Sequence, residues 1–181
     1  MIGLHPTSVN ESYEQELAIV HKYLSTSREF VAIGEIGLDL YWDKTFLKEQ
    51  ILVFEKQIEW ALEYGLPIVI HSREAFEYIY KVMEPYKNTP LTGIFHSFTG
   101  TSEEAAKLLE FEGFMLGING VVTFKKSTLP EALTTVPLER IVLETGSPYL
   151  APVPNRGKRN ESANVRDTLM KVADIYQMDP E

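Results

Sequence analysis

The sequence predicts a parallel α/β fold in which strands and helices alternate, as in a (β/α) barrel. Four apolar runs each end in polar or glycine residues, and a helix-like stretch separates each run from the next. They span residues 31–35, 67–71, 92–96 and 140–146. The C-terminal ends of parallel barrel strands converge on one face, which carries the active site. Glu35, His71 and His96, which end the first three runs, are therefore expected on one functional face.

Six strands are expected in all, at residues 1–4, 31–34, 67–70, 92–95, 114–118 and 140–144. All are apolar on both faces, as buried parallel strands are. Right-handed crossovers between them give a curved sheet, so the predicted class is α/β, TIM-barrel-like. About eight strands normally close such a barrel. An incomplete barrel of six strands would have open sheet edges, through which self-association is expected.

Local signals place helices between these strands. Apolar residues recur at every third or fourth position over residues 47–61, and Gly65 with Pro67 ends that helix. A second amphipathic pattern follows His71. Three later helices are marked by a Thr101–Glu104 capping box, by Pro130 in a first turn and by an N-capping Ser162.

Composition indicates an ordinary globular domain. A chain of 181 residues with 44% hydrophobic residues is expected to form one domain. Cysteine is absent, no apolar run is long enough to span a membrane, and the N-terminus lacks the features of a signal peptide. A cytoplasmic protein without membrane association is therefore expected. The formal charge of −9 argues against non-specific nucleic-acid binding by the whole surface.

One glutamate and two histidines together match the His₂-carboxylate set of catalytic zinc sites. A buried carboxylate such as Glu35 needs a partner charge, hydrogen bonds or a metal. The alternative is a Glu–His hydrogen-bond network without metal. His5, before Pro6, is weaker evidence for a ligand, and His21 is interpreted as a surface or packing residue.

Five motifs resemble signatures of the TatD family of metal-dependent deoxyribonucleases. They lie at residues 34–39, 71–75, 95–101, 143–152 and 156–161, in the family's order, and extend through essentially the whole chain. The resemblance implies a TIM-barrel-like (β/α)8 metal-dependent hydrolase fold with one or two divalent metal ions, Zn, Mg or Mn. It also implies that Glu35 is shared between the metals and that His71 and His96 complete the second metal site, so that all three are catalytic.

Two departures from the family pattern stand out. Family members begin with a strand that ends in His-x-His, and no His-x-His occurs in these 181 residues. We therefore expect a single TatD-like domain over residues 1–181 that is truncated at the N-terminus and shortened at the C-terminus. Gly146 stands where the family has a metal-binding Asp, so it is a degenerate metal and base position. Strand alternation predicts that the neighbouring Glu144 points away from the site.

The implied reaction is hydrolysis of DNA phosphodiester bonds by metal-activated water, in the manner of a 3'-5' exonuclease. Phosphate contacts are expected from Arg73, Lys125, Arg156 and Arg159. Composition alone favours a solvated charged loop for the segment 156–159. Two alternatives stay open: an inactive barrel that retains one metal site, and a related metal-dependent ester or amide hydrolase. Gly146 and the lack of His-x-His predict little or no nuclease activity for the chain as written.

Overall fold

The computed structural model describes residues 1–27 and 29–180, which group into two compact units. The first unit comprises Met1–Phe95 with Phe111–Phe114, and the second comprises His96–Glu110 with Met115–Glu181. A single domain over residues 1–181 stays a prediction. None of the helices in the described ranges is both long enough and apolar enough to cross a membrane.

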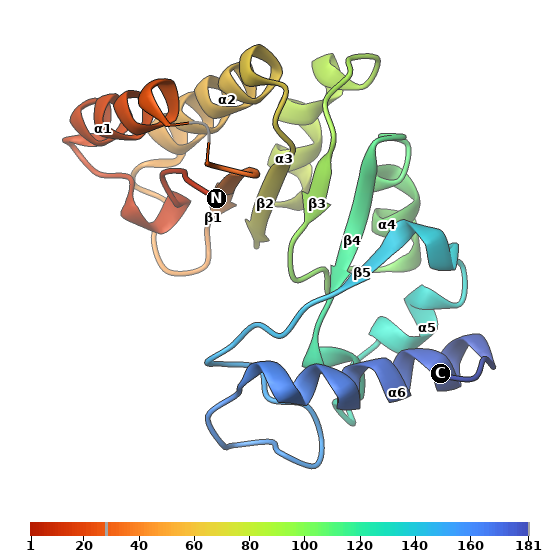
Figure 1. The fold of residues 1–181 in the computed structure, drawn as a ribbon. Helices are drawn as coiled ribbons and strands as arrows, with labels where there is room; N and C mark the ends of the chain where they lie inside the picture. Colours follow the sequence, from red (N-terminus) through yellow and green to blue (C-terminus); the bar gives the residue numbers. More distant parts are fainter. Residues whose placement is uncertain (28, 181) are drawn as a thin grey trace. The chain divides into compact units, whose positions relative to one another are not determined.

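Strands and helices alternate through the first unit. In chain order its elements are η1 (Pro6–Ser8), α1 (Tyr13–Thr26), β1 (Ile33–Asp39), α2 (Leu47–Tyr64), β2 (Ile68–Arg73), α3 (Phe76–Met83), η2 (Glu84–Tyr86) and β3 (Gly93–Phe95). β2 pairs in parallel with β1 on one side and with β3 on the other (Figure 1). The predicted parallel α/β arrangement is thus confirmed in this unit.

β1 and β2 are longer than the sequence predicts. Their pairing runs from Ile33 opposite Ile68 to Asp39 opposite Arg73, with a register shift between Gly34 and Ile36. The predicted strand ends at residues 34 and 70 were wrong because residues 36–39 and 71–73 continue the pairing beyond them. The shift leaves Glu35 in a bulge, a feature that re-aims a side chain and is common beside active sites.

Gly37 allows the two strands to approach closely after the bulge. Its φ is +132°, and a Cβ at this position would collide with the carbonyl oxygen of His71. A residue with a side chain would therefore separate β1 from β2 at the level of His71. This glycine keeps His71 in register beside the bulged strand.

Residues 1–4 do not form the predicted strand. Ile2 makes a single parallel bridge with Ile33. Beyond it, Leu4 N donates to Gln57 Oε1 at 2.6 Å, and Gln57 Nε2 donates to Leu4 O at 3.2 Å. The side chain of Gln57 thus takes the backbone groups that a neighbouring strand would use, so the expectation for residues 1–4 was wrong. Gln57, on α2, is fully buried.

α2 supplies much of the core of the first unit. It begins and ends close to the predicted positions, with Gly65 as a left-handed C-cap at φ +63°. Phe54 and Ile58 on its inner face are fully buried, as are Ile33, Ile68 and Ile70 on the strands. His21 on α1 stacks on Trp60 of α2, with ring centroids 4.9 Å apart, which agrees with its predicted packing role.

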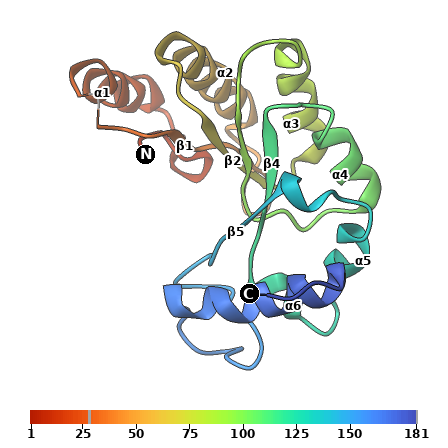
Figure 2. The same cartoon turned by 45° about the vertical axis from the view of Figure 1, so that its right-hand side comes forward.

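The second unit contains α4 (Ser102–Leu108), β4 (Phe114–Ile118, whose first residue belongs to the first unit), η3 (Gly120–Thr123), α5 (Leu129–Leu133), η4 (Leu138–Arg140), β5 (Ile141–Leu143), η5 (Ser162–Asn164) and α6 (Val165–Tyr176). β4 and β5 pair in parallel, from Leu116 opposite Ile141 to Ile118 opposite Leu143. α5 and α6 lie beside each other (Figure 2).

Two of the three helix-start signals predicted from the sequence are confirmed in the second unit. The Thr101–Glu104 capping box is present, and Pro130 lies in the first turn of α5, as predicted. Ser162 does not cap the last helix but begins a short 3-10 turn ahead of α6. Within the described ranges the chain thus has five strands, one fewer than predicted, and all the pairings given for each unit are parallel.

Candidate metal centre

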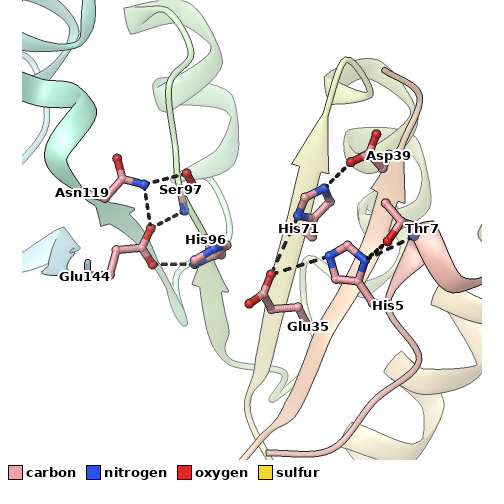
Figure 3. A network of polar contacts seen from close by, with 9 residues as sticks. All are labelled: His5, Thr7, Glu35, Asp39, His71, His96, Ser97, Asn119 and Glu144. Carbon is pink, nitrogen blue, oxygen red and sulfur yellow. Dashed lines mark hydrogen bonds and ion pairs between the residues drawn. The ribbon is translucent and has the colours of Figure 1, made fainter. Parts of the chain in front are cut away.

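Two imidazoles and one carboxylate gather in the first unit. We call His5, Glu35 and His71 the His5 cluster. Glu35 Oε2 lies 3.7 Å from His5 Nε2 and 3.8 Å from His71 Nδ1 (Figure 3). The two imidazole rings meet edge to face with centroids 4.5 Å apart. All three side chains are half-buried, so they are held by the fold and still reach solvent.

The opposite nitrogen of each ring has its own partner. His71 Nε2 lies 2.8 Å from Asp39 Oδ2, and Asp39 is buried. His5 Nδ1 lies 2.7 Å from the hydroxyl of Thr7 and 3.2 Å from its backbone N. A carboxylate that accepts the outer N–H orients a histidine ligand and fixes its tautomer, as Asp39 can for His71, whereas His5 Nδ1 accepts from Thr7 N and is oriented by that contact. Both rings therefore turn their inner nitrogens toward Glu35.

The residues of the His5 cluster fit a divalent ion. Their ligand atoms all lie within 4.8 Å of one another. A tetrahedral zinc ion with bonds of about 2 Å would hold its ligand atoms about 3.3 Å apart. The observed separations of 3.7 and 3.8 Å are therefore within a small side-chain rotation of that geometry. Two imidazole nitrogens and one carboxylate oxygen suit zinc better than magnesium, which prefers oxygen ligands.

His96 lies in the second unit, where it takes part in a network of hydrogen bonds. We call His96, Ser97, Asn119 and Glu144 the Glu144 cluster. His96 Nδ1 lies 2.6 Å from Glu144 Oε2, while Ser97 N donates to Glu144 Oε1 at 2.6 Å (Figure 3). Asn119 Nδ2 donates to Ser97 Oγ at 2.6 Å and to Glu144 Oε1 at 3.4 Å. Glu144 is thus the acceptor on which this cluster converges.

The side chain of Glu144 does not point in the direction that the sequence predicts. Alternation along a strand predicts that Glu144 points away from the site, yet its carboxylate contacts His96. β5 ends at Leu143, so the alternation rule no longer applies at the next residue. Gly117 on β4 provides the space, because a Cβ there would lie 2.7 Å from Glu144 Oε2.

The predicted ligands are thus distributed over two clusters. Glu35 and His71 lie together, and the group of possible ligands found among the described residues adds His5 to them rather than His96. Joint binding of an ion by Glu35, His71 and His96 stays a prediction. The signal for His5 was its position before Pro6 at the end of an apolar segment, to which the sequence analysis gave little weight.

The predicted phosphate-binding residues are divided between the two units. Arg73 is at the end of β2, with its guanidinium carbon 3.7 Å from the ring centroid of Tyr41. Lys125 and Arg156 line one hollow of the second unit, of about 460 Å³, where Arg156 stacks on Phe124 at 3.6 Å. Arg159 is exposed and is not among the residues that line this hollow. Gly146 has a φ of +67°.

Comparisons with known proteins identify the family of this chain. The family model described as TatD related DNase matches residues 1–181. The "Uncharacterized metal-dependent hydrolase YabD" of Bacillus subtilis is 39% identical over 178 residues, which cover 98% of this chain and 69% of that protein. The "3'-5' ssDNA/RNA exonuclease TatD" of Pantoea ananatis is 34% identical over 177 residues, covering 94% of this chain and 67% of that protein. The chain spans about two thirds of the length of these relatives.

A solved structure extends the match to the fold. The crystal structure of YJJV, a TatD homolog from Escherichia coli, superposes with a TM-score of 0.89 at 26% identity, covering 96% of this chain and 67% of that one. The predicted fold class, α/β with an incomplete TIM-barrel-like architecture, is thereby confirmed. Because the family model matches the chain from its first residue to its last, this protein belongs to the TatD-related DNase family of metal-dependent hydrolases.

Proposed function

We propose that this protein hydrolyses phosphodiester bonds in DNA with a divalent metal ion, in the manner of a 3'-5' exonuclease. The observation that supports this most strongly is the His5 cluster, in which two imidazoles turn toward one carboxylate. Family membership and the name of the Pantoea ananatis relative add to it. Glu35, His71 and His96 are the proposed catalytic and metal-binding residues, and the geometry adds His5.

The roles of the residues follow from their contacts. Glu35 supplies negative charge between the two imidazoles of its cluster. Asp39 holds the Nε2 side of His71, which directs Nδ1 toward Glu35. Glu144 does the same for His96 by holding Nδ1, which turns Nε2 away from the Glu144 cluster. When bound, a divalent ion supplies Lewis-acid polarisation of a phosphoryl oxygen and lowers the pKa of a water molecule toward neutrality.

Basic residues would hold the DNA backbone. Arg73 and the hollow that contains Lys125 and Arg156 offer cations to phosphates, and the exposed Arg159 lies on the same loop as Arg156. Such contacts position a strand without reading its sequence. We expect the reaction to be slow, because Gly146 has no ligand atom to offer and these 181 residues contain no His-x-His pair.

The test is cleavage of labelled DNA under single-turnover conditions, with protein in excess over a 5'-labelled oligonucleotide. Zn²⁺, Mn²⁺ and Mg²⁺ are compared with a chelator control, and a nitrophenyl ester is offered in parallel. We expect slow, metal-dependent shortening of the DNA from its 3' end. His71→Ala should abolish it, because Glu35 then keeps a single imidazole neighbour in its cluster.

The matched control is His21→Ala, which removes the histidine that stacks on Trp60 outside the His5 cluster. This variant should cleave as the wild type does once its thermal melting shows that it is folded. Metal-dependent cleavage of the ester with intact DNA would replace the proposed activity by carboxylic ester hydrolysis. Cleavage of neither substrate would favour an inactive barrel.

A further inference from the structure

An exposed aromatic pair stands where β1 ends. Tyr41 and Trp42 follow Asp39 by two and three residues, and their rings meet edge to face with centroids 4.7 Å apart. Trp42 is 79% exposed and Tyr41 is 49% exposed. The guanidinium of Arg73 lies 3.7 Å from the Tyr41 ring centroid and 5.8 Å from that of Trp42. We call Tyr41, Trp42 and Arg73 the aromatic platform.

The aromatic platform is attached to the His5 cluster through one carboxylate. Asp39 Oδ2 lies 2.8 Å from His71 Nε2, and Asp39 Oδ1 accepts a hydrogen bond from Tyr41 N at 3.1 Å. Leu40 N donates to Arg73 O at 2.9 Å, which ties the start of the loop to the end of β2. The platform therefore has a defined position relative to the candidate metal ligands, although it lies on a loop.

A hollow of about 220 Å³ adjoins the platform. Trp42 forms part of its wall, with Asp39, Asp43 and Phe46 from the same strand end and loop, and with Pro6 and Thr7 from the turn that holds His5. The hollow thus lies between Trp42 and the segment that positions one of the candidate ligands.

The charges around the hollow favour a neutral ligand over an anionic one. Its described lining residues include two carboxylates, Asp39 and Asp43, and no lysine or arginine. Hydrogen bonds from Thr45 hold the pKa of Asp43 below its ordinary value, so this carboxylate is charged at neutral pH. A phosphate would be repelled there. A neutral aromatic ring with N–H groups would be accepted, and Arg73 offers a cation to a phosphate on the side of Tyr41.

We propose that Trp42 stacks on an unpaired nucleobase of the nucleic acid whose backbone is bound at the His5 cluster. This inference rests on the proposed function and names the residue that distinguishes single strands from duplexes. In the interior of a duplex, each base is paired and stacked on both faces, so only an unpaired base offers Trp42 a free face away from the duplex ends. Stacking on an aromatic side chain is tolerant of sequence, because every base has a π-face.

The experiment measures binding of a labelled octanucleotide whose phosphorothioate linkages resist cleavage, with Zn²⁺ present. Affinity is read by fluorescence anisotropy, and tryptophan emission is followed in parallel. The two tryptophans are Trp42, which is exposed, and Trp60, which is buried, so quenching by a stacked base reports Trp42. We expect quenching in the wild type and a loss of affinity of about tenfold in Trp42→Ala, in the range expected for one stacked base.

Three controls separate stacking from a structural effect. Trp42→Phe should keep most of the affinity while losing the emission change. Tyr23→Ala removes a comparably exposed aromatic residue from α1 and should bind as the wild type does. A probe with one abasic position at the strand end should bind the wild type more weakly, yet bind Trp42→Ala as well as the intact probe does.

The outcomes distinguish the two proposals. If the wild type cleaves DNA with metal while Trp42→Ala binds and cleaves equally well, the base-stacking role is overturned and the proposed function stands. If the wild type neither binds nor cleaves any oligonucleotide, both fail. Equal affinity of the wild type for the single strand and for the matching duplex would also overturn the role of Trp42.

Discussion

The His5 cluster and the Glu144 cluster both combine imidazole with carboxylate, but they are bonded differently. In the His5 cluster, one carboxylate lies at 3.7 and 3.8 Å from two imidazole nitrogens. In the Glu144 cluster, one carboxylate lies at 2.6 Å from both an imidazole nitrogen and a backbone N–H. The first spacing leaves room for an ion among the three groups, whereas the second is a set of direct hydrogen bonds that orients His96. Both clusters contain imidazole and carboxylate groups, so it is the distance between carboxylate and imidazole that makes the His5 cluster the candidate metal site.

The largest effect is expected for Glu35→Gln. The amide keeps the size of the side chain but loses its charge and presents an N–H₂ group to the two imidazoles. Calorimetric titration should show Zn²⁺ affinity falling by more than about 100-fold, because even outer-shell changes cost about 10- to 100-fold. Glu16→Gln, an exposed change on α1, is the matched control. Unchanged zinc binding by Glu35→Gln would remove the His5 cluster from consideration as the metal centre.

Asp39→Asn comes next. Its oxygen would keep the hydrogen bond from Tyr41 N, so its N–H₂ group would face His71 Nε2. His71 would then have to accept at Nε2 and carry its proton on Nδ1, the nitrogen that faces Glu35. We expect a loss of zinc affinity of about 10- to 100-fold.

The tautomer of His71 can be read directly from nitrogen chemical shifts of the imidazole. Asp43→Asn is the control, since Asp43 bonds Thr45 rather than a histidine. If the His71 proton stays on Nε2 and zinc affinity is retained, Asp39 does not orient this ligand.

A smaller effect, of a different kind, is expected for Glu144→Gln. The charged acceptor of Ser97 N and His96 Nδ1 is lost, which should lower the free energy of unfolding by about 1–3 kcal/mol. Zinc binding at the His5 cluster should be unaffected. Denaturant unfolding measures the free energy of unfolding, and calorimetry measures the zinc affinity. Glu131→Gln on the surface of α5 is the control. A large loss of zinc affinity would show that the two clusters bind one ion together.

The smallest effect is expected for Gly146→Asp. The new carboxylate restores the family's residue type, but the 181 residues still contain no His-x-His pair. Cleavage of DNA should therefore change by less than about threefold, because groups that act as one catalytic unit are strongly non-additive. Gly157→Asp is a matched control, since Gly157 also has a positive φ, of +81°, and open space around it. Robust cleavage by Gly146→Asp would show that this single residue limits the reaction.

Features with local causes could be predicted from the sequence. The strand Phe114–Ile118 has the predicted bounds, because an apolar run lies between Gly113 and Asn119. The Thr101–Glu104 capping box needs only residues that are three positions apart. Parallel pairing followed from the alternation of such elements, so most of the fold was within reach of sequence patterns.

The candidate site depends on long-range contacts, and sequence patterns do not report these. Glu35 was predicted at the end of a strand, yet it lies in a bulge within β1 that forms only through pairing with β2. His5 joins Glu35 and His71 because Leu4 is held by a side chain 53 residues away. Whether His96 shares an ion with Glu35 and His71 stays a prediction.

The amide of Gln57 has a consequence for how the site assembles. It bonds both backbone groups of Leu4, the residue before His5, and also donates to Val53 O within α2. His5 therefore reaches Glu35 only when α2 is packed in place. An ion that requires all three residues binds the native state alone, and such binding adds RT ln(1 + [L]/Kd) to its stability. Zinc binding would thus stabilise the packing of α2 against residues 1–5. The hydrogen-exchange protection of α2 should rise with zinc concentration, because the hydrogen bonds of Gln57 connect α2 to the residue before His5.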